Sequence, residues 1–225
     1  MPSKLIDLDN FLNSPSVNLP ETGEVIKKTE EESKKVPNLL SHLLETRVIT
    51  VNASSEKDFA YFDFSSQDTV RILDTSSLEW DLAFRRGKVI SNGGASSRMG
   101  KAGLIDMGTV EFDTIAEVPE DQYIKDVATK TETENPVLLK WYNYNYLSHK
   151  LTAKKNVYAV RTADGKYAKF QFLSFYCDNK EAGCVKIRYV YQDNGSNSFL
   201  KPTSEITTTS STASLTPATK IETPF

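Results

Sequence analysis

Apolar and polar residues alternate in short runs along the middle of the chain, with a period of two residues. Alternation of this kind is typical of β-strands that bury one face. Turn residues separate the runs, as at 65–68 and at the Asp164–Gly165 pair, which favours a tight hairpin. The pattern therefore predicts strands at 47–51, 59–64, 70–73, 78–84, 88–90, 110–115, 141–146, 157–161, 166–176 and 185–191.

Helical signals are few. Pro119 and the acidic residues after it suit the N-terminus of a short helix that ends by about Ala128. The short amphipathic segment 39–44 is expected to pack onto the domain. Strands do not alternate with long helices, which argues against a Rossmann-type or barrel α/β fold. We predict a mainly β protein, a single domain of antiparallel sheets with one or two short helices.

The two ends differ in composition from the middle. Residues 1–38 are polar and carry a mixed-charge run, which predicts a solvated tether. Residues 196–225 are rich in Ser, Thr and Pro, with too few apolar side chains to offset the entropy cost of ordering them. We therefore expect disordered ends around a β domain at 39–195, with room for an edge strand near 198–200.

The longest predicted loop follows the strand that begins near Trp80. It runs from Ser91 to Gly103 and is rich in glycine, which lets a backbone approach a ligand or another chain segment closely. A long loop fed by a well-formed strand is more often functional than not. A phosphate-binding loop does not fit, because Ala102 stands where the magnesium-binding Ser or Thr would be and no helix follows. The distinctive side chains in the loop are Arg98, Met99 and Lys101.

The two cysteines, Cys177 and Cys184, lie between two alternating runs. Pairing them across a hairpin places Phe172 opposite Tyr189 and makes the apolar faces of both runs coincide. The same register brings the cysteines to a separation that a disulfide can span. We predict this disulfide rather than two free thiols, and it indicates an oxidising compartment.

Composition and net charge argue against several classes of function. The formal net charge of −3 gives the chain as a whole no electrostatic reason to bind nucleic acid. No run of about 18 apolar residues is present, so no transmembrane segment is expected. His42 and His149 are the two histidines, which leaves little support for a Ser-His-Asp triad or a zinc site. We expect a binding protein rather than an enzyme.

Soft ligands for a haem iron are present. Met99 and Met107 lie in or just after the glycine-rich loop. Haem iron accepts Met sulfur or His nitrogen axially, and Arg98 and Lys101 are suited to holding the propionates. Both methionines also have a structural explanation: Met99 as an exposed loop residue and Met107 as a core residue.

Two stretches are distinctive as sequence motifs. The first is the Trp-Asp strand at 80–84 that leads into Asn92-Gly93-Gly94, and the second is the hairpin at 157–167. Together they resemble the HmuY-like haem-binding lipoprotein family, and the resemblance extends over 47–192. It implies a mostly β, haemophore-like protein that captures haem from host haem proteins and passes it to a TonB-dependent outer-membrane receptor for iron acquisition.

The resemblance also implies a location and a ligand set. The protein would be secreted or lipid-anchored at the outer-membrane surface, with a signal peptide and a lipid-bearing cysteine preceding this chain and residues 1–35 as the tether. Family members hold haem between two axial ligands, His in some and Met in others. The pairs implied here are Met99 with Met107 and Met99 with His149, beside Arg98 and Lys101. His149 also has a structural explanation, as a side chain that packs and hydrogen-bonds at a strand end. The alternative is a non-catalytic surface interaction or adhesin module of the same fold that does not bind haem.

Overall fold

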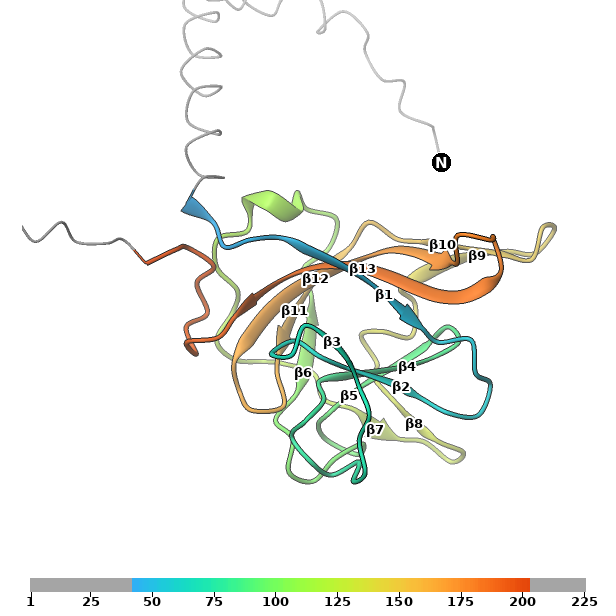
Figure 1. Ribbon diagram of the computed structural model, residues 1–225, viewed down its shortest axis with the longest axis horizontal. Coiled ribbons are helices and arrows are strands. Elements are labelled where there is room, and N and C mark those ends of the chain that lie inside the picture. The colour runs from blue at the N-terminus through green and yellow to red at the C-terminus, as the bar shows by residue number, and fades with distance from the viewer. Residues whose placement is uncertain (1–41, 203–225) are drawn as a thin grey trace, which may run out of the picture.

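The computed structural model describes residues 42–202 and consists largely of β-strands and the loops between them (Figure 1). The sheets are antiparallel, which confirms the predicted mainly β class. Within residues 42–202 one 3-10 turn, η2 (Phe112–Thr114), interrupts the strands. The strands are β1 (Arg47–Asn52), β2 (Ala60–Asp63), β3 (Asp68–Val70), β4 (Leu82–Arg85), β5 (Lys88–Ser91), β6 (Gly103–Asp106), β7 (Val127–Ala128), β8 (Thr133–Glu134), β9 (Tyr142–Asn145), β10 (Lys150–Ala153), β11 (Val157–Arg161), β12 (Tyr167–Tyr176) and β13 (Ala182–Gln192).

Two sheets enclose the main core. A five-stranded sheet has the order β1-β13-β12-β11-β6, and a four-stranded sheet has the order β3-β2-β4-β5. Figure 1 shows the first lying over the second. Aromatic rings fill the space between them, and Trp141 stacks on Phe172 with ring centroids 4.1 Å apart. Phe62 from the smaller sheet meets Tyr189 from the larger one edge to face, a favourable ring geometry.

A second apolar cluster covers part of the outer face of the five-stranded sheet. Phe112 from η2, Leu43 and Phe199 pack there against Val157 and Val190. Leu43 bridges to Leu200, so the two ends of the described chain lie side by side. The chain therefore remains part of the folded body through Phe199, beyond the boundary predicted at residue 195. The predicted tether at 1–38 and the rest of the tail lie outside the described residues.

Two predicted elements are absent, and a third, the strand expected at 70–73, is displaced to β3 at Asp68–Val70. The helix expected from Pro119 to Ala128 is absent, because Ile124 pairs with Leu104 and Asp126 with Gly94, so neighbouring strands and loops take its backbone hydrogen bonds. The strand expected at 110–115 contains η2 instead, because Phe112 turns inward to cap the outer cluster.

The C-terminal hairpin keeps the predicted faces only in part. Phe172 lies opposite Ile187 rather than Tyr189, a shift of two residues that keeps the predicted faces as far as Phe172. Beyond it Ser174 lies opposite Lys186, and Phe175 is buried in the main core. Register shifts between Phe172 and Tyr176 then realign the strand ends. The predicted disulfide between Cys177 and Cys184 is present, with Cα atoms 4.8 Å apart.

The glycine-rich loop is a packed junction between the two sheets. The side chain of Asn92 is fully buried and donates to the carbonyl oxygens of Ser77 and Trp80. A Cβ atom on Gly100 would lie 1.9 Å from the carbonyl oxygen of Asn92, and one on Gly93 would lie 2.1 Å from that of Ala102. These glycines are therefore required by close backbone approach.

Asp81, the acidic residue of the Trp-Asp strand, fastens this junction to the hairpin between β11 and β12. Its carboxylate accepts hydrogen bonds from the backbone N–H groups of Phe64 and Ala163. Burial raises the pKa of Asp81 to about 8, although both backbone donors oppose the shift. The motif that looked like a ligand-binding loop thus has a structural role in holding the sheets together.

Lys169 is buried on the outer face of β12. Its ammonium donates to the carbonyl oxygens of Phe112 and Ile115, at 2.8 and 2.7 Å, and lies 4.6 Å from the Phe112 ring centroid. Burial lowers its pKa to about 8; Asp113 opposes the shift and Arg188 adds to it. The ammonium fastens η2 to the sheet at the cost of desolvating a charge.

We predict that Gly100→Ala destabilises the fold while Gly87→Ala does not. The new methyl group at residue 100 meets backbone, so the free energy of unfolding should fall by about 1–3 kcal/mol or more. At Gly87 the nearest atom is a Tyr142 ring carbon at 3.4 Å, an ordinary contact, and the change should stay within about 0.5 kcal/mol. Urea unfolding measures both, and equal stability of the two variants would contradict the packed junction.

We also predict a pH dependence from Lys169. Between pH 8 and 10.5 the unfolded chain binds a proton that the folded chain lacks, so the free energy of unfolding rises with pH, by at most about 3 kcal/mol. Denaturant titrations from pH 8 to 10 should show the parent protein gaining stability relative to Lys169→Met. The comparison removes the opposing contributions of Asp81 and of the buried tyrosines, which titrate alike in both proteins. Parallel profiles for the two proteins would mean that the pKa of Lys169 is unshifted.

Candidate functional site

The predicted ligand Met99 lies on the surface, with 63% of the side chain exposed, and its neighbours Arg98 and Lys101 are exposed as well. Met107, by contrast, packs against the outer apolar cluster. The first three residues are therefore accessible to a ligand, whereas the position of Met107 agrees with its explanation as a core residue.

The predicted axial pairs are not brought together. The backbone N–H of Lys101 donates to Ala163, which places the Met99 loop beside the turn before β12. His149 lies beyond the other end of that strand, because its neighbour Leu151 bonds to the Tyr176 hydroxyl. About 30 Å of β12 therefore lies between Met99 and His149.

Met99 and Met107 are likewise apart, since the chain runs extended from Lys101 through β6 to Met107. Six residues of extended backbone cover about 20 Å. In this fold neither predicted pair shares a site.

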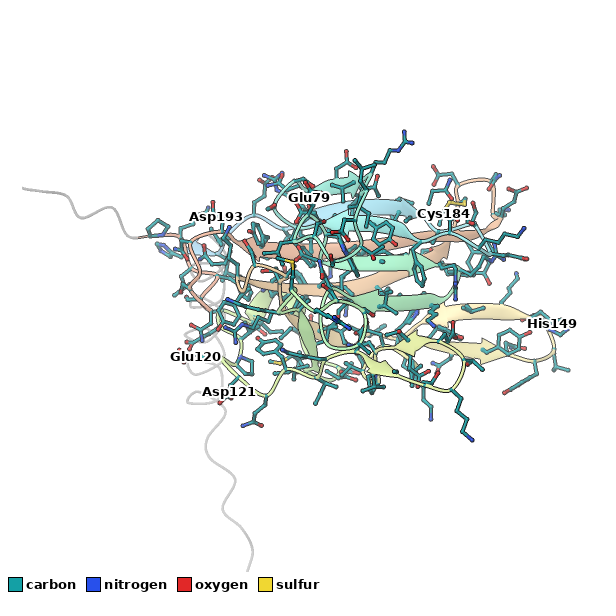
Figure 2. All side chains as sticks on the ribbon, turned by 90° about the horizontal axis from the view of Figure 1, so that it is seen from below. Glu79, Glu120, Asp121, His149, Cys184 and Asp193 are labelled. Atoms are coloured by element: carbon teal, nitrogen blue, oxygen red, sulfur yellow. A yellow bond between two sulfur atoms is a disulfide. The ribbon has the colours of Figure 1, made fainter. Side chains whose placement is uncertain are left out.

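His149 occupies a prominent position. Figure 2 shows it at one end of the molecule, at the tip of the β9–β10 hairpin, with Glu120, Asp121 and Asp193 at the opposite end. Its Nδ1 atom lies 2.6 Å from the Tyr144 hydroxyl. That contact leaves Nε2 open to solvent, because no hydrogen bond to it is present among residues 42–202.

The hairpin carries a partly exposed aromatic face, which we call the hairpin face and define by Tyr142, Tyr144, His149 and Leu151. Tyr144 and His149 are exposed, whereas Tyr142 and Leu151 are half-buried against the main core. Tyr144 pairs with Leu151 across the hairpin, and residues opposite each other point to the same face. Tyr142 is two residues from Tyr144 and shares that face by strand alternation. Nearby at the tip, Tyr146 and Leu147 are 80% and 97% exposed.

A groove of about 500 Å³ lies at the base of the hairpin face. The Arg86–Gly87 turn reaches the hairpin there, since Gly87 lies near the side chains of Tyr142 and Leu151. The volume is in the range of small-molecule sites. The groove is lined by Glu56, Arg85, Arg86, Gly87, Lys88, Val89, Glu132, Glu134, Leu138, Leu139 and Tyr142.

Two of the three cationic side chains in the groove, Arg85 and Lys88, form ion pairs. Glu132 pairs with Lys88 and, at 2.8 Å, with Arg85. The Lys88 hydrogen bond lowers the pKa of Glu132, and Arg85 adds to the effect. Arg86 has no carboxylate partner among the described residues; its guanidinium donates to the carbonyl oxygens of Ser54 and Ala182. Arg86 is thus the cation available to a ligand carboxylate.

Sequence reasoning missed this groove. Arg85, Arg86 and Lys88 stand together in the printed sequence around a tight turn, and that basic turn was the signal available. The turn forms a groove only when the β9–β10 hairpin packs beside it, and the sequence alone does not show that contact. Over residues 42–202 no cluster of three potential metal-ligating side chains from His, Cys, Asp and Glu is present. No helix there is long and apolar enough to cross a membrane.

The fold is shared with several solved structures. The apo HmuY analogue of Tannerella forsythia has a TM-score of 0.55 at 21% identity, covering 67% of this chain and 98% of its own. A protein of Bacteroides vulgatus provisionally named HmuY-like haem-binding has a TM-score of 0.52 at 23% identity, covering 65% and 91%. One of Bacteroides fragilis provisionally named a lipoprotein has a TM-score of 0.52 at 17% identity, covering 65% and 89%. At these identities the likeness shows the fold alone.

The sequence itself carries a family signature. No curated protein matches the chain. The family model described as HmuY protein matches residues 55–189, which is more than half of the chain and includes both the Trp-Asp strand and the hairpin at 157–167. The chain belongs to the HmuY family.

Proposed function

We propose that this protein binds haem non-covalently on the hairpin face, with Nε2 of His149 as the axial ligand of the iron. The observation that carries the proposal is the exposed His149 with Nδ1 at the Tyr144 hydroxyl, on an aromatic face that leads to the groove. Family membership supports haem as the ligand.

The chemistry of these residues fits haem. An axial histidine usually donates its other ring N–H to a nearby acceptor, which fixes the tautomer and the ring direction, and Tyr144 is placed to accept it. Aromatic and aliphatic side chains, here Tyr142 and Leu151, suit the flat apolar macrocycle. Arg86 is the cation suited to a propionate, since charge-assisted bonds to carboxylates are strong. Bound there, haem would supply its iron as the coordinating centre.

The proposal assigns other roles to the earlier candidates. Met107 packs the outer cluster. Arg98, Met99 and Lys101 lie beside the turn before β12, too far from His149 to share one iron. A single axial histidine is a known mode of haem ligation.

We further propose a haemophore-like role at the cell surface. The exposed hairpin tip gives a partner protein direct access to bound haem, as transfer from host haem proteins and delivery to an outer-membrane receptor would require. The disulfide agrees with an oxidising compartment. The structural neighbour named as a lipoprotein supports a lipid-anchored or secreted form. The proposed role is binding without catalysis.

We predict that His149→Ala abolishes the sharpened Soret band that the intact protein develops on titration with haemin. Tyr144→Phe should weaken binding by about tenfold or more, because it removes the acceptor that orients the ring. His42→Ala is the matched control, since it removes the other histidine, at the far edge of the domain, and should bind like the parent protein.

Two outcomes would contradict the proposal. If His149→Ala binds haemin normally and Met99→Ala does not, the iron ligand lies in the glycine-rich loop. If the intact protein gives no saturable response with either oxidised or reduced haem, the interaction or adhesin module is the better description.

A further inference from the structure

A second cavity, of about 410 Å³, opens beside the five-stranded sheet. It shares no lining residue with the groove at the hairpin face. Its walls come from the segment before η2, the end of β10 with the two residues after it, the middle of β12 and one residue of β13. They are formed by Thr109, Val110, Glu111, Ala153, Lys154, Lys155, Gln171, Phe172, Leu173 and Arg188.

The lining is strongly basic in a protein of net charge −3. Lys154, Lys155 and Arg188 face a single lining carboxylate, Glu111. Across residues 42–202 the side chains of Lys154 and Lys155 make no ion pair or hydrogen bond. Arg188 makes one long ion pair, in which an Nη atom lies 3.8 Å from a carboxylate oxygen of Asp113. The cavity therefore holds more positive charge than its own acidic residues neutralise.

One buried amide holds two of the basic segments in place. The side chain of Gln171 accepts a hydrogen bond from Nε of Arg188 and donates one to the backbone carbonyl of Lys155. The Arg188 guanidinium also lies over the Phe112 ring, 4.4 Å from its centroid. Both polar ends of Gln171 are thus used, and the Nη atoms of Arg188 are fixed in direction. Such preorganisation lowers the entropy cost of binding an anion.

We propose that this cavity binds a phosphomonoester, a phosphate group carried by an organic molecule. A phosphomonoester has close to two negative charges at neutral pH and three peripheral oxygens. It can therefore bind Arg188 from β13 and the two lysines after β10 at the same time. The planar fork of Arg188 suits two phosphate oxygens, and the lysines act as point charges. The volume leaves space for part of the attached molecule beside Val110 and Leu173.

The experiment compares a soluble and a membrane-bound source of the same group. Glycerol 3-phosphate is titrated into the full chain and followed by calorimetry. In parallel, the protein is sedimented with vesicles of phosphatidylcholine alone or with added phosphatidic acid. The test variant is Lys154→Gln with Lys155→Gln. The matched control is Lys57→Gln with Lys130→Gln, which changes the net charge equally at two other exposed lysines.

We predict saturable binding of at least one source and a loss of about tenfold for each lysine removed from the cavity. The control double variant should bind like the parent protein. Binding of glycerol 3-phosphate points to a soluble ligand, and binding to phosphatidic acid vesicles alone points to a lipid headgroup. The haemin titration should be unchanged in the test variant, so the two sites are judged separately.

Two results would overturn the proposal. One is the absence of binding to both sources at low salt, where exposed charges are least screened. The other is equal weakening by the test and control variants, which would show that the interaction depends on net charge rather than on the cavity.

Discussion

The burial of β12 on both faces is the constraint on which the rest of the structure depends. Phe170 and Phe172 fill the core between the sheets, while Tyr167 and Lys169 are covered on the outside. A strand covered on both sides leaves little room for its polar side chains to reach water. Lys169 therefore needs carbonyl partners, and η2 supplies them through Phe112 and Ile115.

The two sheets are joined by polar groups as well as by the core. Asp81 links β2 to the turn between β11 and β12, and Asn92 holds the start of the glycine-rich loop. Asp126 adds a second buried carboxylate, which accepts bonds from Ser91 and Asn135. Buried polar groups need such partners, so each contact restricts which loop conformation the chain can adopt. A loop built in this way is rigid, which explains why its glycines have structural roles.

The exposed regions of this fold carry the proposed functions. The β9–β10 hairpin extends from the body and leaves Tyr144 and His149 in solvent. The basic cavity lies where the outer cluster around Phe112 ends, and Gln171 connects its walls. Both sites rest on the same two-sided strand, because Tyr176 contacts the hairpin and Gln171 lies within the cavity. The proposed binding residues thus lie at the margins of the packed two-sheet scaffold.

The sequence by itself determined the longest strands, the hairpin turn at Asp164–Gly165, the disulfide and the family. These follow from alternation, turn chemistry and motifs, which act over short distances in the chain. The sequence did not predict the short strands β6, β7, β8 and β10. It did identify His149 and Met99 as possible ligands. Only the tertiary structure decided that these two lie at opposite ends of β12, because their separation depends on which strands pair. Tertiary contacts also decided the register of the C-terminal hairpin and the extended backbone at Ile124. They likewise formed the groove at Arg86 and the cavity at Arg188. Each depends on contacts between segments distant in sequence, and no local pattern specifies such contacts.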